Sequence, residues 1–322
     1  MPHPRKTLFH WDYGLKLTRA DLAVDVRRRQ PRAFISHAHS DHIARHEYAL
    51  ATPATAALYQ LRLGPRPTLD LPYRMPIEWG GLRLTTYPAG HCLGSAMLLA
   101  EDQGQSLLYT GDFKLGPSAT AERAELPHAE TLVIESTYGH PDYRLPPREE
   151  VLGEFFALVR RTLEAGAVPV ILGYVLGKSQ ELTRLLCSQG IGVLQHRKIY
   201  EVSRVYEAFG VHLGDYGCFT GRAGPGQAVV VPPGTPLGAI RNAVRFALTG
   251  WAIEAGAKYR LGVDYALPLS DHADYPELLE AVERVGPQTI FCTHGPASFV
   301  DRLRDLGHDA HVLGRPTQQR LF

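Results

Sequence analysis

The feature of this sequence that most constrains its fold is the six-residue run His37-Ala38-His39-Ser40-Asp41-His42, which holds four potential metal ligands. It follows the apolar segment Ala33–Ile35, which is typical of a buried strand. The first two histidines are two positions apart, so in an extended chain their side chains point the same way. One short loop can therefore offer two imidazoles to one metal ion, and a carboxylate with an imidazole to a second. Imidazole suits zinc and iron, and a carboxylate widens the choice to manganese.

The composition is that of an ordinary globular protein. The 322 residues are 44% hydrophobic and 21% charged, and 34 basic against 33 acidic residues give a net charge of +1. A chain of this length can form a large core or two domains. Because the whole molecule is not basic, a surface for nucleic acid has to be local.

The cysteines and the apolar pattern indicate where the protein works. Its four cysteines are widely spaced and form no C-x-x-C pair, which favours a reducing compartment over a disulfide framework. No stretch approaches the 18 apolar residues of a membrane span. Residues 1–10 contain charges but no apolar centre, unlike a signal peptide. We therefore expect a cytoplasmic protein with no membrane association.

Four later segments share one design, an apolar strand that ends in a turn with a histidine or a carboxylate. Such a strand end can deliver its polar side chain to a metal, and small neighbours reduce crowding. Taken separately, each residue has an ordinary interpretation as a polar turn residue. The segments are Pro88–Ala96 with His91, Leu107–Phe113 with Asp112, Thr131–Gly139 with Glu135, and Thr289–Pro296 with His294.

In this order, the motifs resemble those of the metallo-β-lactamase superfamily. The run at 37–42 is similar to the superfamily signature, and His91 and Asp112 match its third and fourth metal motifs. The stretch Glu-Ser-Thr-Tyr-Gly at 135–139 resembles the first diagnostic motif of the β-CASP nucleases. Residues 267–274, centred on His272, resemble the second, and residues 289–296 resemble the third.

The resemblance implies an α/β fold: a metallo-β-lactamase αββα sandwich with an inserted α/β β-CASP cap domain. The sandwich would comprise residues 1–148 and, after the cap at 149–265, a returning part at 266–322. From the apolar periodicity we expect a helix over 149–165 in the cap. In the first part, we expect residues 43–64 to be helical with a break at Pro53.

The resemblance also assigns ligands to two divalent metal ions, with zinc as the first choice and manganese as the second. One ion would be held by His37, His39, His91 and Asp112, and the other by Asp41, His42, Asp112 and His294. Asp112 would bridge the two. Asp25, at the end of an earlier strand, would support the metal loop from behind.

For catalysis, the resemblance implies that His272 protonates the leaving group and that Glu135 orients this histidine. We expect Asp41 to act at the second metal. We expect Lys178 to contact a substrate phosphate, because Gly177-Lys178 opens a helix after a strand and such a helix start favours anions. Ser136 and Thr137, beside Glu135, are further expected substrate contacts.

Several functions remain open. Within the group, the chain is most similar to short bacterial exonucleases found with a DNA ligase, which implies an exonuclease acting on DNA ends or single strands in repair, with a ligase or other repair proteins as partners. The alternatives are an RNA-processing nuclease with the same site, a small-molecule metallo-hydrolase, and a scaffold that binds nucleic acid without cleaving it. A scaffold would be expected to have lost metal ligands, and here the set is intact.

Overall fold

The computed structural model describes residues 8–238 and 240–314, which form two compact units. The core unit comprises Met1–Pro117, Glu122–Asp142 and Tyr275–Phe322, and the cap unit comprises Ser118–Ala121 and Tyr143–Asp274. The cap expected from the sequence, 149–265, lies inside the cap unit, and its limits stay a prediction. Residues 1–7, on which part of the signal-peptide argument depends, lie outside the described residues.

The core unit contains two sheets, each of which has antiparallel and parallel strands. The first has the order β1-β2-β3-β4-β5-β6, and the second has the order β19-β18-β11-β10-β9-β8-β7. The strands of the first are Phe9–Trp11, Leu15–Leu17, Leu22–Val24, Arg32–Phe34, Tyr48–Ala51 and Thr68–Asp70. Those of the second, from β7, are Ile77–Trp79, Leu82–Pro88, Ala96–Asp102, Gln105–Tyr109, Thr131–Glu135 (β11), Thr289–Thr293 (β18) and Asp309–Val312 (β19).

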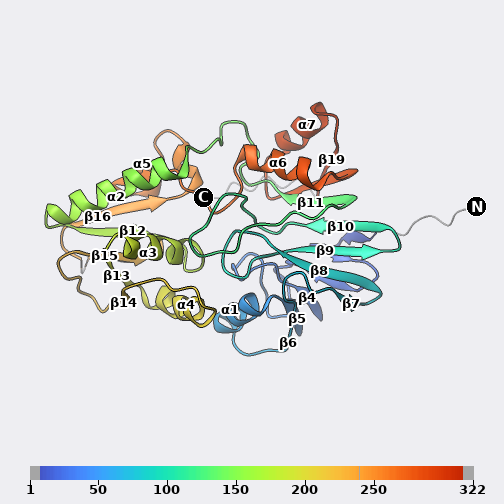
Figure 1. The fold of residues 1–322 in the computed structure, drawn as a ribbon, viewed down its shortest axis with the longest axis horizontal. Helices are drawn as coiled ribbons and strands as arrows, with labels where there is room; N and C mark the ends of the chain where they lie inside the picture. The colour runs from blue at the N-terminus through green and yellow to red at the C-terminus, as the bar shows by residue number, and fades with distance from the viewer. Residues whose placement is uncertain (1–7, 239, 315–322) are drawn as a thin grey trace, which may run out of the picture. The chain divides into compact units, whose positions relative to one another are not determined.

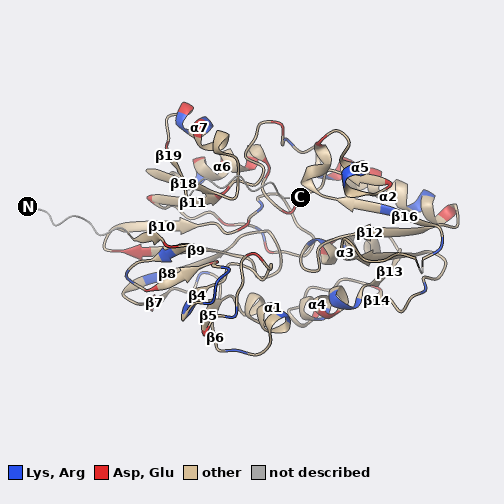
Figure 2. Cartoon of the chain, turned by 180° about the vertical axis from the view of Figure 1, so that it is seen from behind, with Lys and Arg blue, Asp and Glu red and all other residues tan. Residues whose placement is uncertain are grey.

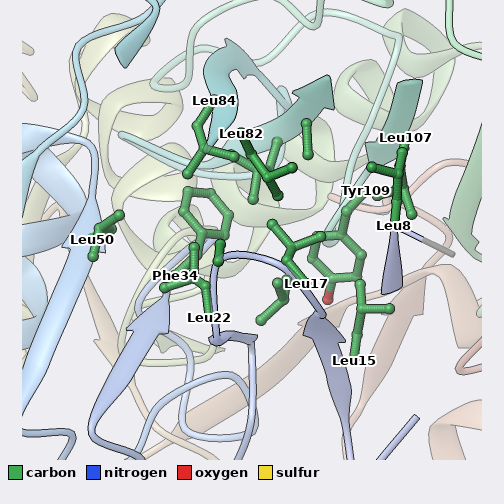
Figure 3. Close-up of a cluster of buried hydrophobic side chains, with 14 of the residues drawn as sticks. Leu8, Leu15, Leu17, Leu22, Phe34, Leu50, Leu82, Leu84, Leu107 and Tyr109 are labelled. Carbon is green, nitrogen blue, oxygen red and sulfur yellow. The ribbon is translucent and has the colours of Figure 1, made fainter. Parts of the chain in front are cut away.

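The two sheets pack together through one apolar core. Phe34 from the first sheet and Leu82 and Tyr109 from the second belong to the same buried cluster, as Figure 3 shows. Helix α1 (Pro53–Leu63) packs on β5 and β6, whereas α6 (Tyr275–Val285) and α7 (Ala297–Asp305) lie beside β11 and β19 (Figure 1). The α/β class and the layered sandwich expected from the sequence are confirmed.

Strand direction brings the metal-binding motifs of each sheet to one edge. In the first sheet β3, β4 and β5 are parallel. In the second, β8 and β10 both run antiparallel to β9, and β10, β11 and β18 are parallel. The carboxyl ends of β8, β10, β11 and β18 therefore lie at the same edge, and the loops that carry His91, Asp112 and His294 begin there. The Ala96 amide donates to the Ser36 carbonyl at 2.9 Å and joins this edge to the end of β4.

The cap unit is built on a six-stranded parallel sheet of order β14-β13-β15-β12-β16-β17. Neighbouring residues of β12 belong to different apolar clusters: Ile171 packs with residues of α2, α3 and α4, and Val170 packs with residues of β15 and of the loops around it. The strands, from β12, are Val168–Leu172, Gly192–Gln195, Tyr216–Cys218, Gln227–Val231, Ala243–Leu248 and Tyr265–Leu267. The helices are α2 (Arg148–Glu164), α3 (Lys178–Ser188), α4 (Arg197–Ala208), η1 (Gly250–Ile253) and α5 (Ala257–Leu261).

One local expectation is wrong. Residues 43–47 form a loop and Tyr48–Ala51 is strand β5, so only the part from Pro53 onward is helical. Short apolar runs do not distinguish a strand from a helix by themselves, and here pairing with β4 and β6 decides the outcome. No helix among residues 8–238 and 240–314 is both long and apolar enough to cross a membrane.

Candidate metal centre

The loop after β4 places its histidines beside two other loops of the core unit. Nitrogen atoms of His37, His39 and His91 and a carboxylate oxygen of Asp112 all lie within 4.8 Å of one another. The His37 Nε2 atom is 3.5 Å from Asp112 Oδ2, and His91 Nε2 is 3.0 Å from His39 Nδ1. These are the residues that the sequence assigns to one ion; their role as ligands stays a prediction.

The donor set fits a divalent cation such as zinc. His37 is fully buried, and its Nε2 atom has no hydrogen-bond partner among residues 8–238 and 240–314. A buried imidazole nitrogen without a partner costs free energy that a metal bond would recover. Donor atoms around a tetrahedral zinc ion lie roughly 3.3 Å apart, given bonds of about 2.0–2.1 Å, which is close to the separations above.

A second group of donors shares Asp112. His42, Asp112 and His294 each place a donor atom within 4.8 Å of the others, and His42 Nε2 is 3.3 Å from Asp112 Oδ2. Asp41, the fourth ligand expected from the sequence, is exposed, and its Oδ2 atom is 3.8 Å from His42 Nε2. His294 has φ +59°, which is uncommon for a residue with a side chain and often marks a functional site.

Asp25 lies behind the histidine loop and holds it in place. Its carboxylate accepts hydrogen bonds from the Ser36 amide (2.7 Å), the Ser36 hydroxyl, His42 Nδ1 (2.8 Å) and the Tyr109 hydroxyl (2.9 Å). Because a carboxylate can only accept, Nδ1 of His42 carries the proton, and Nε2 is left for a metal. Burial and the Asp25 charge raise the pKa of Tyr109 well above its usual range, so its hydroxyl stays a donor.

The pKa values of the two buried histidines move in opposite directions. Burial, together with the charge of His42, holds the pKa of His37 well below its ordinary 6.5, so this imidazole is neutral and can bind a cation. Burial alone would lower the pKa of His42, but the carboxylates of Asp112 and Asp25 outweigh it and raise that pKa well above 6.5. Binding of a cation at His42 would therefore release a proton.

The loop that carries His91 is held by residues that no sequence motif identifies. The Gly94 carbonyl accepts hydrogen bonds from Thr52 Oγ1 (2.6 Å) and Thr55 Oγ1 (2.8 Å) at the start of α1, and the Gly94 amide donates to Glu122 Oε2 at 3.2 Å. The Thr52-Pro53 pair does mark a helix start. Its contact with a loop about 40 residues away leaves no signal in a single sequence.

Hydrogen bonds link neighbouring segments of the core unit through Glu135, Ser136 and Thr137. Glu135 Oε1 accepts from the Phe113 amide (3.0 Å), next to Asp112, and Oε2 accepts from Thr137 Oγ1 (2.6 Å). The Ser136 hydroxyl and amide both donate to the Thr293 carbonyl, at 3.1 and 2.8 Å. Within the core unit, these side chains therefore hold the end of β18, just before His294, and the loop that follows β10. Their contacts with substrate stay a prediction.

Lys178 and His272 both belong to the cap unit. Lys178 is the first residue of α3 and is only 3% exposed. Its Nζ atom lies 3.2 Å from the Leu269 carbonyl and 3.6 Å from Asp271 Oδ1. His272 is partly exposed, and its amide donates to Ser270 Oγ at 2.8 Å. The buried position of Lys178 gives no support to the phosphate contact expected from the sequence.

Comparison with known proteins gives similarity along the whole chain. Residues 257–313 match the family model described as a Zn-dependent metallo-hydrolase RNA specificity domain. The chain is 40% identical over 326 residues, 97% of its length, to a protein of Opitutus terrae named "Probable DNA ligase". It spans 32% of that relative, so about two thirds of the relative lies outside the match.

Two further similarities cover less or are more distant. The chain is 38% identical to "Endoribonuclease YSH1" of Mycosarcoma maydis over 109 residues, 33% of this chain and 12% of that protein. A crystal structure of a protein of unknown function from Enterococcus faecalis V583 superimposes with a TM-score of 0.61 and 15% identity, covering 88% of this chain and 79% of that one. At that identity, the likeness supports the fold alone.

Proposed function

Because the chain belongs to the β-CASP group of the metallo-β-lactamase superfamily, we propose that it is a metal-dependent nuclease that hydrolyses phosphodiesters in nucleic acid. The observation that supports this most directly is the pair of donor groups that share Asp112 at one edge of the core unit. A phosphodiester is an anion and repels hydroxide. Divalent cations at such a centre offset the phosphate charge and activate water at neutral pH.

We propose that two ions bind, zinc in the first instance and manganese as the alternative. A donor set of histidines and carboxylates suits either metal. His37, His39, His91 and Asp112 would hold one ion, and Asp41, His42, Asp112 and His294 would hold the other. The Nε2 atom of His37, which has no hydrogen-bond partner in the described part of the chain, supports the first set, and the positive φ of His294 supports the second.

The chain's own groups would orient these donors and move a proton. Asp25 fixes the tautomer of His42 through the 2.8 Å bond at Nδ1. We propose that His272 donates a proton to the departing sugar oxygen, since a histidine holds a proton near neutrality and that oxygen is otherwise a poor leaving group. As the family resemblance implies, Glu135 would favour the protonated form of this histidine, because a carboxylate stabilises an imidazolium.

DNA is the substrate that we favour. The relative that matches 97% of this chain is named "Probable DNA ligase", and about two thirds of it lies outside the match, so one polypeptide there joins a chain like this one to a further region. Trimming DNA ends before ligation would be a reason for the two to act together. We therefore propose an exonuclease that acts on DNA ends in the cytoplasm, with a ligase or another repair protein as partner.

RNA is the second candidate. The matched domain is described by RNA specificity, and one relative is named as an endoribonuclease. A small-molecule hydrolase would have no need for the cap unit or for Glu135 and His272. In a scaffold without activity, the two donor groups that share Asp112 would have no function.

Charge on the surface supports a local rather than a general contact with nucleic acid. Basic and acidic residues are interspersed along α2, α4 and α7 (Figure 2). Arg27, Arg28 and Arg29 on the loop before β4, and Arg32 at the start of β4, are exposed, and Arg29 pairs with Glu47 at 3.2 Å. This cluster is a candidate for phosphate contacts in the core unit.

Matched oligonucleotides test the proposal. Single-stranded and duplex DNA and RNA of one sequence, labelled at either end, are incubated with the wild type and with Asp112→Ala, which removes the shared donor. We expect stepwise shortening of DNA from an end by the wild type and no cleavage by the variant. Cleavage of RNA alone would move the substrate to RNA, and cleavage of neither polymer would refute the nuclease function.

A further inference from the structure

The cap unit buries a lysine that the proposed reaction does not use directly. Lys178 opens α3 with a side chain only 3% exposed. An ammonium group loses its hydration on burial, so it must be compensated by charge and hydrogen bonds. Its Nζ atom has three oxygen neighbours: the Leu269 carbonyl at 3.2 Å, Asp271 Oδ1 at 3.6 Å and Glu181 Oε2 at 3.8 Å.

These neighbours belong to a small network of balanced charge. Arg148, at the start of α2, donates from a terminal guanidinium nitrogen to Glu181 Oε1 at 2.9 Å, and the Ala119 amide donates to the same oxygen at 3.1 Å. Arg148 and Lys178 are cationic, and Glu181 and Asp271 are anionic, so the four charges cancel. Nζ donates a hydrogen bond to the Leu269 carbonyl, and the carboxylates of Asp271 and Glu181, at 3.6 and 3.8 Å, are its ion-pair partners. Groups of the cap unit itself therefore compensate the buried ammonium charge.

Two of the three oxygen atoms lie on the segment that leads into His272. Lys178 binds the carbonyl of Leu269 and pairs with the carboxylate of Asp271. Between them, Ser270 Oγ accepts from the His272 amide at 2.8 Å and donates to the His272 carbonyl at 2.9 Å. One side chain from α3 therefore fixes the segment on both sides of Ser270, immediately before the proposed proton donor.

We propose that Lys178 is a positioning residue that fixes the backbone of residues 269–271 and thereby the orientation of the His272 imidazole. This inference rests on the proposed function of His272. Lys178 acts on the proton-transfer step through the segment and makes no contact with the nucleic acid. Its loss should therefore lower kcat and leave KM unchanged, because binding of the polymer does not depend on it.

The experiment compares Lys178→Met with the matched control Lys198→Met, which removes an exposed lysine from the start of α4. With a DNA oligonucleotide, we expect Lys178→Met to lose about 10²-fold in kcat, the usual effect of a small misplacement of a reacting group. KM, metal content and the salt dependence of binding should stay at the wild-type values, as should all parameters of Lys198→Met. With bis(p-nitrophenyl) phosphate, whose leaving group needs no proton, most of the loss should disappear.

A double-mutant cycle separates positioning from general damage. If Lys178 acts through His272, Lys178→Met added to His272→Ala should cause no further loss of kcat. Additive losses, or an equal loss on the activated substrate, would overturn the inference in favour of a purely structural lysine. A higher KM with a flatter salt dependence would overturn it in favour of a phosphate contact.

Two further outcomes keep the test decisive. Lys178→Met leaves Asp271 without its cation, which can prevent folding. If the variant does not fold, Lys178→Met combined with Asp271→Asn restores the balance of charge and should show the same pattern in kcat. A wild type with no phosphodiesterase activity refutes the proposed function together with this inference, whereas an active wild type with unchanged kcat in the variant refutes the inference alone.

Discussion

Asp25 and His42, 17 residues apart in sequence, share a hydrogen bond of 2.8 Å from His42 Nδ1 to the carboxylate at the carboxyl end of β3. This bond leaves Nε2 of His42 facing Asp112 at 3.3 Å. The same carboxylate also accepts from the Ser36 amide, so it fixes both the loop and the ring. The donor atoms are thus arranged by residues that would not themselves touch a metal.

The first prediction concerns this bond. Asp25→Asn keeps the size of the side chain but replaces one acceptor oxygen with a donor amide, which no longer fixes the proton on Nδ1 of His42. We expect metal affinity to fall about 10- to 100-fold, the usual effect of losing such a partner. The affinity is measured by competition with a chelator. Asp21→Asn, an exposed carboxylate before β3, is the control and should bind metal as the wild type does. Equal affinity in both variants would contradict this role for Asp25.

The second prediction concerns the approach of Gly295 to Ser136. A Cβ atom at position 295 would lie 2.0 Å from the Ser136 carbonyl oxygen, so Gly295→Ala must displace the loop that carries His294. We expect about 1–3 kcal/mol loss in the free energy of unfolding, as for other overpacked sites, and loss of nuclease activity. Gly153→Ala, in α2 with open space around it, should be neutral or slightly stabilising. Wild-type activity in Gly295→Ala would contradict this prediction, because it would show that the His294 loop accommodates the added methyl group without loss of function.

The third prediction concerns pH and His46, which is buried behind the metal loop. Burial lowers the pKa of His46 to about 4, and the charge of Arg66 assists while Asp25 opposes. The unfolded histidine titrates near 6.5, so between pH 6.5 and 4 the unfolded state binds more protons. The contribution to stability is complete above 6.5 and is lost as the pH falls through this window.

Denaturant unfolding at several pH values measures this effect. In the wild type, the Gln30 amide donates a hydrogen bond to His46 Nδ1 at 3.2 Å. The asparagine in His46→Asn keeps an acceptor for this amide but does not titrate. We expect the free energy of unfolding of this variant to fall less steeply between pH 6.5 and 4 than that of the wild type. Parallel curves for the two proteins would mean that His46 does not titrate in this range.

The fourth prediction concerns His272 itself. His272→Ala should keep its metal and lose about 10²–10⁴-fold in kcat on DNA, the usual contribution of a proton-transfer group. A p-nitrophenyl phosphodiester should recover most of the loss. His212→Ala, an exposed histidine of the cap unit, is the control and should be unaffected. Loss of metal, or an equal defect on both substrates, would mean that His272 is not the acid.

The family and the fold class could be predicted because the motifs are local. Four donors within six residues and a histidine or carboxylate after each apolar strand are visible in one sequence, and parallel strand ends meet at one edge. The structure places His37, His39, His91 and Asp112 together, as it does His42, Asp112 and His294. The resemblance to the β-CASP nucleases is confirmed.

What could not be predicted depends on contacts between distant segments. The apolar pattern predicts a helix at Tyr48–Ala51, but this segment is a strand, because pairing with β4 and β6 determines its conformation. The hydrogen bonds that Gly94 makes with Thr52, Thr55 and Glu122 have no local signature in the sequence. The sequence shows Lys178 after a glycine at a helix start, but not the carboxylates that surround it.

The metal content of the active protein tests the central claim most directly. Elemental analysis of purified wild type that cleaves a phosphodiester should find about two equivalents of divalent metal per chain, as a dinuclear site requires. Asp112→Ala, which removes the donor shared by both groups, should lose both or nearly both ions together with activity. Active wild type with less than about half an equivalent of metal per chain would contradict the account, because this is below even one ion per chain.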